Sequence, residues 1–128
     1  MDKNTNALNW FEIPATDINR ATKFYSSVFN IKMEDMGEQM GMKMMGFPSE
    51  MGNGLVSGSL VQGPEHKPST EGAVIYLNAN PSIQAVLDRI EPAGGKVVAP
   101  KMEISPEIGC MAFFIDSEGN KVALHAQN

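Results

Sequence analysis

The apolar residues between positions 18 and 28 recur at three- and four-residue spacing, which is the repeat of one face of an α-helix. These positions are Ile18, Ala21, Phe24, Tyr25 and Val28. Asp17 stands directly before them, and its short carboxylate side chain is well suited to cap the first turn. The sequence therefore predicts a helix that starts after Asp17 and buries one apolar face. A strand is predicted before it, at about residues 7–13.

Three further strands are predicted between this helix and the middle of the chain. Residues 31–36 and 40–47 flank the turn sequence GEQ, and a strand near residues 55–61 follows the turn sequence PSEMGN. The segment QGPEHKPSTEG, at about residues 62–72, combines glycine, proline and charges without a hydrophobic period. This segment is predicted to link two halves of the chain.

The second half of the chain repeats the order of elements in the first. AVIYLNA at residues 73–79 predicts a strand, and Asn80 and Pro81 suit the cap and the first position of a helix. The buried face of this helix is predicted from four apolar residues, Ile83, Val86, Leu87 and Ile90. KVVA then predicts a short strand and PKMEISPE a loop, and IGCMAFFI and KVALHA predict two strands around the turn DSEGN.

The two halves can be superposed, because Trp10 falls on Ala73 and Asp17 on Asn80 at the same offset. Each half is then a βαβββ module, which cannot bury its sheet face alone. The modules are therefore expected to pair around a shared concave cavity, which is a common place for a ligand. The chain is predicted to be one α+β domain over residues 1–128, with module one at about 7–62, a linker at about 62–72 and module two at about 73–127.

Composition and charge exclude several classes of function. Hydrophobic residues make up 42% of the chain, which is enough for a packed core. The net charge is −5 and the lysines and arginines are scattered, so no nucleic-acid or membrane partner is expected. The polar N-terminus has no signal-peptide core, and Cys110 is a single cysteine that allows no intrachain disulfide. These features favour a cytoplasmic protein.

Three segments in the right order resemble one known superfamily. FEIPATDINRATKFYSSVFN resembles the opening of the vicinal oxygen chelate superfamily, the glyoxalase, bleomycin-resistance and dioxygenase group. AVIYLNANPSIQAVLDRIEPAGGKV resembles the opening of its second module, and GCMAFFIDSEGNKVALH its closing strands. The resemblance covers nearly the whole chain. It implies two βαβββ modules that form a half-open barrel around a cavity, and a homodimer that pairs through its sheets.

The resemblance also implies where a metal ion would be held. In metal-dependent members four His, Glu or Gln side chains, from the first and last strands of each module, converge on one divalent ion. The corresponding positions in this chain are Trp10, Val56, Ala73 and Ala123, and none of these side chains binds a metal. A register slip of one residue in either direction brings in no histidine or carboxylate. No metal and no cofactor is therefore expected.

Two ionisable residues remain as candidates for chemistry on the cavity face. Side chains alternate along a strand, so Glu12 shares the face of Trp10 and His125 shares the face of Ala123. As a functional hypothesis, Glu12 and His125 form a metal-free acid–base pair. As the alternative, both are structural polar residues near a strand end and the C-terminus. His66 in the linker is expected to be solvated and is given no role.

The methionines are unevenly distributed, with seven of the ten between residues 33 and 51. Methionine adapts to irregular apolar surfaces, so this segment could form an adaptable pocket wall. The alternative is that these residues fill the core or lie exposed in turns. A metal site built on thioethers is disfavoured because no cysteine or histidine lies among them.

The leading hypothesis is a metal-free, glyoxalase-like protein that binds a small, partly apolar or aromatic molecule, as bleomycin-resistance relatives do. The predicted ligand contacts are Trp10, Val56, Ala73, Ile75 and Ala123. A metal-independent lyase or isomerase that uses Glu12 and His125 is the alternative. A metal-dependent glyoxalase or dioxygenase would need ligands that the sequence does not place.

Overall fold

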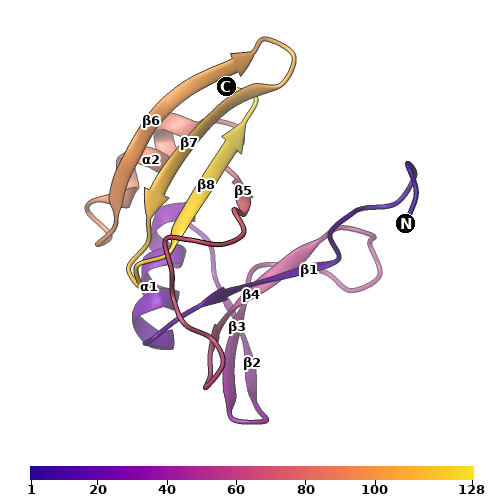
Figure 1. Ribbon diagram of the computed structural model, residues 1–128, viewed down its shortest axis with the longest axis vertical. Helices are drawn as coiled ribbons and strands as arrows, with labels where there is room; N and C mark the ends of the chain where they lie inside the picture. The colour runs from indigo at the N-terminus through magenta and orange to yellow at the C-terminus, as the bar shows by residue number, and fades with distance from the viewer.

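The computed structural model describes all residues from 1 to 128 and contains two helices and eight strands (Figure 1). The first module contains β1 (Trp10–Pro14), α1 (Ile18–Phe29), β2 (Glu34–Gln39), β3 (Met42–Gly46) and β4 (Ser57–Gln62). The second contains β5 (Tyr76–Asn78), α2 (Ile83–Ile90), β6 (Lys96–Ser105), β7 (Gly109–Ile115) and β8 (Lys121–Ala126). The predicted pair of βαβββ modules is confirmed. Neither helix is long and apolar enough to cross a membrane.

The two sheets have the same topology. In the first, the strand order is β1-β4-β3-β2, and in the second it is β5-β8-β7-β6. In each sheet the first strand of the module pairs in parallel with the last, and the remaining neighbours are antiparallel. The sheets do not close into a barrel (Figure 1). The half-open α+β architecture that the family resemblance implies is therefore the one observed.

Helix α1 forms as its sequence pattern predicts. The Asp17 carboxylate accepts hydrogen bonds from the backbone N–H groups of Asn19 and Arg20, both at 3.1 Å. The helix is followed by Asn30, which adopts the left-handed conformation that suits a C-terminal cap. All five predicted apolar positions are buried. They pack in one core cluster with residues of both sheets and of α2.

Helix α2 begins later than the sequence predicted. Its cap is Ser82, whose hydroxyl accepts a hydrogen bond from the N–H of Ala85, and the prediction of Asn80 and Pro81 as cap and first position is wrong. The reason lies in tertiary contacts, because the side-chain oxygen of Asn80 instead accepts from the N–H of Gln127 at 2.8 Å. The predicted buried face of the helix is confirmed.

Strand β6 is longer than expected, because it continues to Ser105 through the predicted loop. The loop prediction for residues 100–107 is therefore wrong over most of its length. Pro100 is tolerated because β6 is the edge strand of its sheet, and its register with β7 shifts between Ala99 and Met102. The strand predicted at residues 73–79 is shorter than expected, since β5 covers only Tyr76–Asn78.

A polar junction joins the two modules at the start of α1. The turn after β7 carries Glu118, whose Oε1 accepts hydrogen bonds from the backbone N–H groups of Thr16 at 2.9 Å and Asp17 at 2.8 Å. The guanidinium of Arg20 donates to both carboxylate oxygens, at 2.7 and 3.0 Å. Burial opposes the charged form, but these hydrogen bonds outweigh it and hold the pKa of Glu118 below its ordinary value.

The same turn is tied to the core by Asp116. Its carboxylate accepts from the hydroxyl of Tyr25 at 2.7 Å and from the backbone N–H groups of Glu118 and Asn120 at 2.9 Å. The side-chain amide of Asn120 also donates to the carbonyl of Pro14 at 2.7 Å, which reaches the end of β1. Burial, together with the nearby Asp116 carboxylate, raises the pKa of Tyr25 well above its usual value. Asp116 and Glu118 thus hold one module against the other.

Candidate functional site

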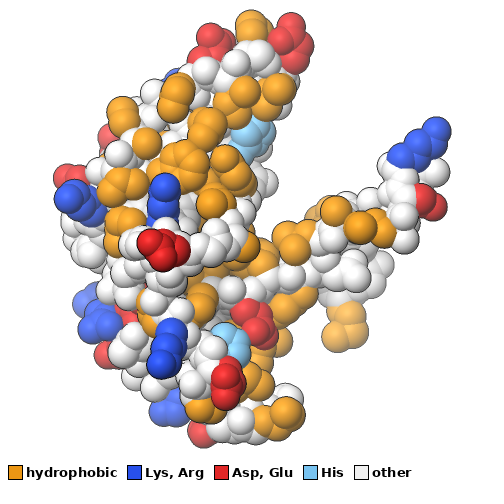
Figure 2. Space-filling model, viewed as in Figure 1, with side chains coloured by type: hydrophobic (Ala, Val, Ile, Leu, Met, Phe, Trp, Pro, Cys, Tyr) orange, Lys and Arg blue, Asp and Glu red, His pale blue; other side chains and the backbone are white.

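The largest cavity lies between the two modules and has a volume of about 910 Å³. It is lined by segments around β1 and β5, by the end of α1 and by one side of α2. Twelve of its 18 lining residues are hydrophobic, which is the composition expected of a small-molecule site. Hydrophobic side chains gather where the arm formed by β1 and β4 meets the rest of the molecule (Figure 2). Val56, Ala73 and Ile75 of the predicted ligand contacts line this cavity.

Trp10 and Ala123 do not line this cavity. Phe11 does, and because neighbouring side chains point to opposite faces of a strand, the indole of Trp10 is directed away from it. Trp10 is partly exposed, with 39% of its surface accessible. Ala123 is fully buried, and its N–H donates to the carbonyl of Ile75 at 3.0 Å. A direct ligand contact by either residue stays a prediction.

The methionine-rich segment does not form the wall of this cavity, since no methionine lines it. Met36, Met40 and Met51 are exposed, whereas Met33 is buried in the core. The expectation of an adaptable methionine wall is therefore wrong for this cavity. The alternative, core filling and exposed turns, holds for part of the segment only, because Met42, Met44 and Met45 are half-buried residues of strand β3.

The strand register refines the positions at which a metal ion would be held. Trp10 pairs with Ser57 rather than Val56, so Ser57 shares its face. In the second module the register pairs Ala123 with Tyr76 rather than Ala73, so Tyr76 shares its face. The refined set is therefore Trp10, Ser57, Tyr76 and Ala123, and it still has no histidine or carboxylate.

The donor atoms present do not fit a divalent metal site of the kind the superfamily implies. No group of three or more His, Cys, Asp or Glu side chains lies close enough to hold an ion. A tryptophan, a serine, a tyrosine and an alanine offer none of the His, Glu or Gln ligands that the superfamily uses for such an ion. No chemical step in this protein is therefore assigned to a metal.

Glu12 is paired with a histidine, but with His66 instead of His125. The Nε2 atom of His66 lies 2.8 Å from Oε1 of Glu12. The imidazole of His125 instead contacts the carbonyl of Ile108 at 2.7 Å. The expectation that His66 is solvated is wrong, since only 17% of its side chain is exposed and its Nδ1 is buried without a hydrogen-bond partner.

The fold-back of the linker explains why sequence analysis missed His66. The N–H of Ser69 donates to the Asn120 side chain at 3.1 Å, and the N–H of Lys121 donates to the carbonyl of Ser69 at 3.2 Å. These bonds attach the linker to the second module and place His66 over β1. The linker has no periodic pattern of hydrophobic residues, so its sequence does not predict which distant residues it contacts.

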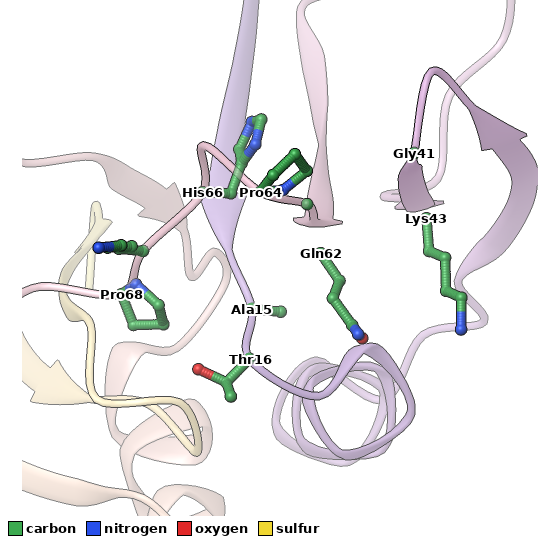
Figure 3. Close-up of a pocket in the computed structure, with 10 residues that line it drawn as sticks. Ala15, Thr16, Gly41, Lys43, Gln62, Pro64, His66 and Pro68 are labelled. Carbon is green, nitrogen blue, oxygen red and sulfur yellow. The ribbon is translucent and has the colours of Figure 1, made fainter.

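A second, polar cavity of about 470 Å³ lies beside His66, between the linker, β3, β4 and the start of α1. In the close-up, Gln62 lies between Thr16 and Lys43 at the base of this cavity, and His66 lies near its top (Figure 3). The amide oxygen of Gln62 accepts from the N–H of Ile18 at 2.8 Å, so it serves the first turn of α1. Gln62 therefore stabilises the start of α1 through this hydrogen bond.

Known proteins match this chain over nearly its whole length. The Glyoxalase/Bleomycin resistance protein/Dioxygenase superfamily matches residues 7–124. A glyoxylase-like domain-containing protein of Didymella fabae is 32% identical over 119 residues, which cover 91% of each chain. The putative glyoxylase CFP32 of Mycobacterium bovis is 28% identical over 122 residues, 94% of this chain and 45% of that protein. This chain therefore spans about half the length of CFP32.

Solved structures share the fold at low identity. Glyoxalase I from Zea mays superposes with a TM-score of 0.67 at 17% identity, over 92% of this chain and 45% of that one. The fosfomycin resistance protein FosX from Listeria monocytogenes gives 0.61 at 17% identity, over 100% of this chain and 94% of that one. The match over residues 7–124 and the relative from Didymella fabae establish more than the fold. This chain belongs to the Glyoxalase/Bleomycin resistance protein/Dioxygenase superfamily.

Proposed function

We propose that this protein binds a small, partly apolar or aromatic molecule in the cavity between its modules, without a metal ion, and so sequesters that molecule. The observation that carries this proposal is the 910 Å³ cavity, whose walls are mostly hydrophobic. Val56, Ala73 and Ile75 lie in those walls. The metal-free part of the proposal is supported by the side chains present, because no three His, Cys, Asp or Glu residues lie close enough together to hold an ion.

The size and composition of the cavity set the expected affinity. Each 100 Å² of apolar ligand surface that is buried contributes about 2.5 kcal/mol, before the cost of association is subtracted. A ligand held mainly by such burial binds with weak to moderate affinity and tolerates related compounds. A panel of related apolar molecules should therefore show graded affinities.

The binding site is tested by filling it. Ala73 lines the cavity and is exposed, so Ala73→Trp places an indole in the ligand space without disturbing the core. Binding of 4-phenylbutanol, measured by isothermal titration calorimetry, should be lost in this variant. Val98→Trp, at an exposed position on β6, is the matched control and should bind as the wild type does. Equal binding by both variants would place the ligand elsewhere.

The metal-free part is tested by elemental analysis of protein expressed in metal-rich medium. We expect no stoichiometric nickel, zinc, iron or manganese after mild chelation. Formation of lactoylglutathione from the adduct of methylglyoxal and glutathione should also stay at background, because that chemistry relies on an ion to polarise the substrate oxygens. About one tightly held metal ion per chain, or turnover stimulated by metal, would refute this part.

A second candidate function is a metal-independent lyase or isomerase, and the contact between Glu12 and His66 favours it. A carboxylate and an imidazole at 2.8 Å can exchange a proton, and 38% of the Glu12 side chain is accessible to a substrate. In this candidate function His66, instead of His125, is the histidine of the acid–base pair with Glu12. In an isomerase, Glu12 would remove a proton beside a substrate carbonyl and return it to another carbon.

This candidate predicts exchange of substrate protons with solvent. Incubation with 2-hydroxy ketones in deuterated water should incorporate deuterium, detected by NMR. Glu12→Gln and His66→Asn should each abolish the incorporation, whereas His125→Asn should leave it unchanged. No incorporation by wild-type protein across the panel would leave the binding function as the one supported.

The predicted homodimer and cytoplasmic location belong to the same proposal. Met102 and Ile104 of β6 expose large apolar surfaces on the second sheet, with 52% and 43% of each residue accessible. Covering such a surface with a second copy would remove it from water. Sedimentation velocity should give twice the chain mass, and a monomer at all concentrations would contradict the dimer.

A further inference from the structure

The large cavity contains one charged residue, Arg89 of α2. The other polar side-chain groups in its lining belong to three asparagines, a serine and the hydroxyl of Tyr76, and no carboxylate is among them. An arginine in an otherwise apolar wall is costly unless its charge finds a partner. The position of Arg89 therefore bears directly on what the cavity holds.

The guanidinium of Arg89 is fixed in place by the backbone. Its Nε donates to the carbonyl of Val28 at 2.7 Å, near the end of α1. The negative end of a helix dipole lies there, which favours a cation. This bond uses one of the five guanidinium donors, and Arg89 is partly buried.

No acidic residue of this chain neutralises Arg89. The only ion pairs join Arg20 to Glu118 and His66 to Glu12. The terminal nitrogens of Arg89 make no hydrogen bond within the chain. A planar fork with two free terminal groups matches the geometry of a carboxylate, which it can bind through two parallel hydrogen bonds.

Three asparagines line the same cavity as Arg89. Asn30 lies directly after α1, close in sequence to Val28, to which Arg89 is bonded. The side-chain oxygens of Asn78 and Asn80 already accept from the N–H groups of Asn80 and Gln127, so their remaining groups are N–H donors. The asparagines therefore add N–H donors to a cavity lining that contains no carboxylate, which suits an anion.

We infer that the ligand of this cavity is an apolar or aromatic carboxylic acid, whose carboxylate binds Arg89 and whose hydrocarbon part fills the space between the modules. This inference rests on the proposed function, because it assigns the chemical class of the molecule that the cavity binds. The apolar part would contact Phe11, Phe47 and Val56. Charge complementarity selects the acid over a neutral molecule of the same shape.

The test compares two probes that differ only in their polar end, 4-phenylbutyrate and 4-phenylbutanol. Calorimetric titration at low salt should give about tenfold tighter binding of the acid by the wild-type protein, because charge-assisted hydrogen bonds are stronger than neutral ones. Arg89→Gln should lose this preference and bind both probes with the affinity of the alcohol. Gln can still donate to the carbonyl of Val28, which protects the fold.

Two controls separate the charge of Arg89 from its structural contact. Arg89→Lys keeps a cation but not the planar fork, so it should retain part of the preference. Lys101→Gln removes a cation from the exposed edge strand β6 and should retain all of it. Circular dichroism and thermal melting confirm that each variant is folded before it is titrated.

The outcomes distinguish this inference from the function on which it rests. If wild-type protein binds the alcohol as tightly as the acid, or if Arg89→Gln keeps the preference, the carboxylate assignment is overturned and the binding function stands. If the wild type binds neither probe, the proposed function fails and the inference fails with it. If binding of both probes weakens as protein concentration rises, a second copy of this chain occupies the cavity, and the inference is overturned.

Discussion

The polar junction around Asp116 and Glu118 and the apolar cavity beside Ile75 both lie between the modules, but they differ in how their polar groups are satisfied. At the junction every carboxylate has several donors from the other module or from its own turn. In the cavity the guanidinium of Arg89 has one carbonyl partner and no counter-charge. The junction carboxylates, whose hydrogen bonds are all made within the chain, hold the modules together. The terminal nitrogens of Arg89 have no such partner, and under the proposed function a ligand would supply one.

This comparison predicts that changes at the junction alter stability, and that changes in the cavity alter binding. The largest effect is expected from Asp116→Ala. The hydroxyl of Tyr25 and the N–H of Asn120 would lose their acceptor in a buried place, which should lower the free energy of unfolding by about 3 kcal/mol. Urea denaturation followed by circular dichroism measures it. Asp88→Ala, which removes an exposed carboxylate from α2, should change it by less than about 0.5 kcal/mol.

A smaller effect is expected from Tyr25→Phe, which removes one hydroxyl from the same network. The loss of a hydrogen bond to a buried carboxylate should lower the free energy of unfolding by about 1.5 kcal/mol at neutral pH. Burial and the Asp116 carboxylate raise the pKa of Tyr25 in the folded state. The wild type is therefore stabilised by the neutral phenol up to about pH 10, the unfolded pKa, and loses this stability as the pH rises further.

The phenol contribution is measured by comparing denaturation curves of the wild type and Tyr25→Phe between pH 8 and pH 11. The difference between the two proteins should shrink above about pH 10. A constant difference over this range would mean that the phenol does not ionise on unfolding.

Glu118→Gln should have a smaller effect again, of about 1 kcal/mol, because solvent around Arg20 screens part of the ion pair. The pKa of Glu118 is lower in the folded than in the unfolded protein, so its contribution is present above about pH 4.3 and is lost as the pH falls through the folded value. The free energies of unfolding of the wild type and Glu118→Gln, measured by urea denaturation at decreasing pH, should therefore converge as the pH falls below about 4.3. A constant difference between the two proteins over this pH range would contradict a lowered pKa of Glu118 in the folded state.

The smallest change in stability is expected in the cavity itself. Ala73→Trp and Arg89→Gln should each alter the free energy of unfolding by less than about 0.5 kcal/mol while they change binding of the phenyl probes. Thermal melts of these variants, without and with probe, measure both quantities. If a cavity variant unfolded as readily as Asp116→Ala, the cavity would be part of the structural core, and the contrast between the two regions would fail.

The strongest local signals in the chain predicted its modules well. The spacing of Phe24 and Tyr25 in the first helix, and of Ile83 and Ile90 in the second, reports burial directly, because side chains that repeat with the helix period share one face. The cap at Asp17 is also a local hydrogen-bond pattern. Repetition of these signals was sufficient to predict two α+β modules, and the family resemblance added the half-open arrangement.

Local signals failed where a distant segment competed for the same group. The side chain of Asn80 is a good helix cap, but it bonds to Gln127, so Ser82 caps α2 instead. Pro100 is typical of a loop, but β6 is an edge strand, so the N–H that proline lacks is not needed for a hydrogen bond to a neighbouring strand. Neither outcome can be derived from neighbouring residues.

The sequence by itself determined the family, the two modules and the lack of metal ligands at the expected strands, because residue identity and periodicity carry that information. Only the tertiary structure brought His66, rather than His125, to Glu12, and placed Arg89 in the wall of an apolar cavity. These placements depend on contacts between segments far apart in the chain, such as the bond from Arg89 to Val28. The geometry of such contacts is set by how the modules pack, which no local pattern records.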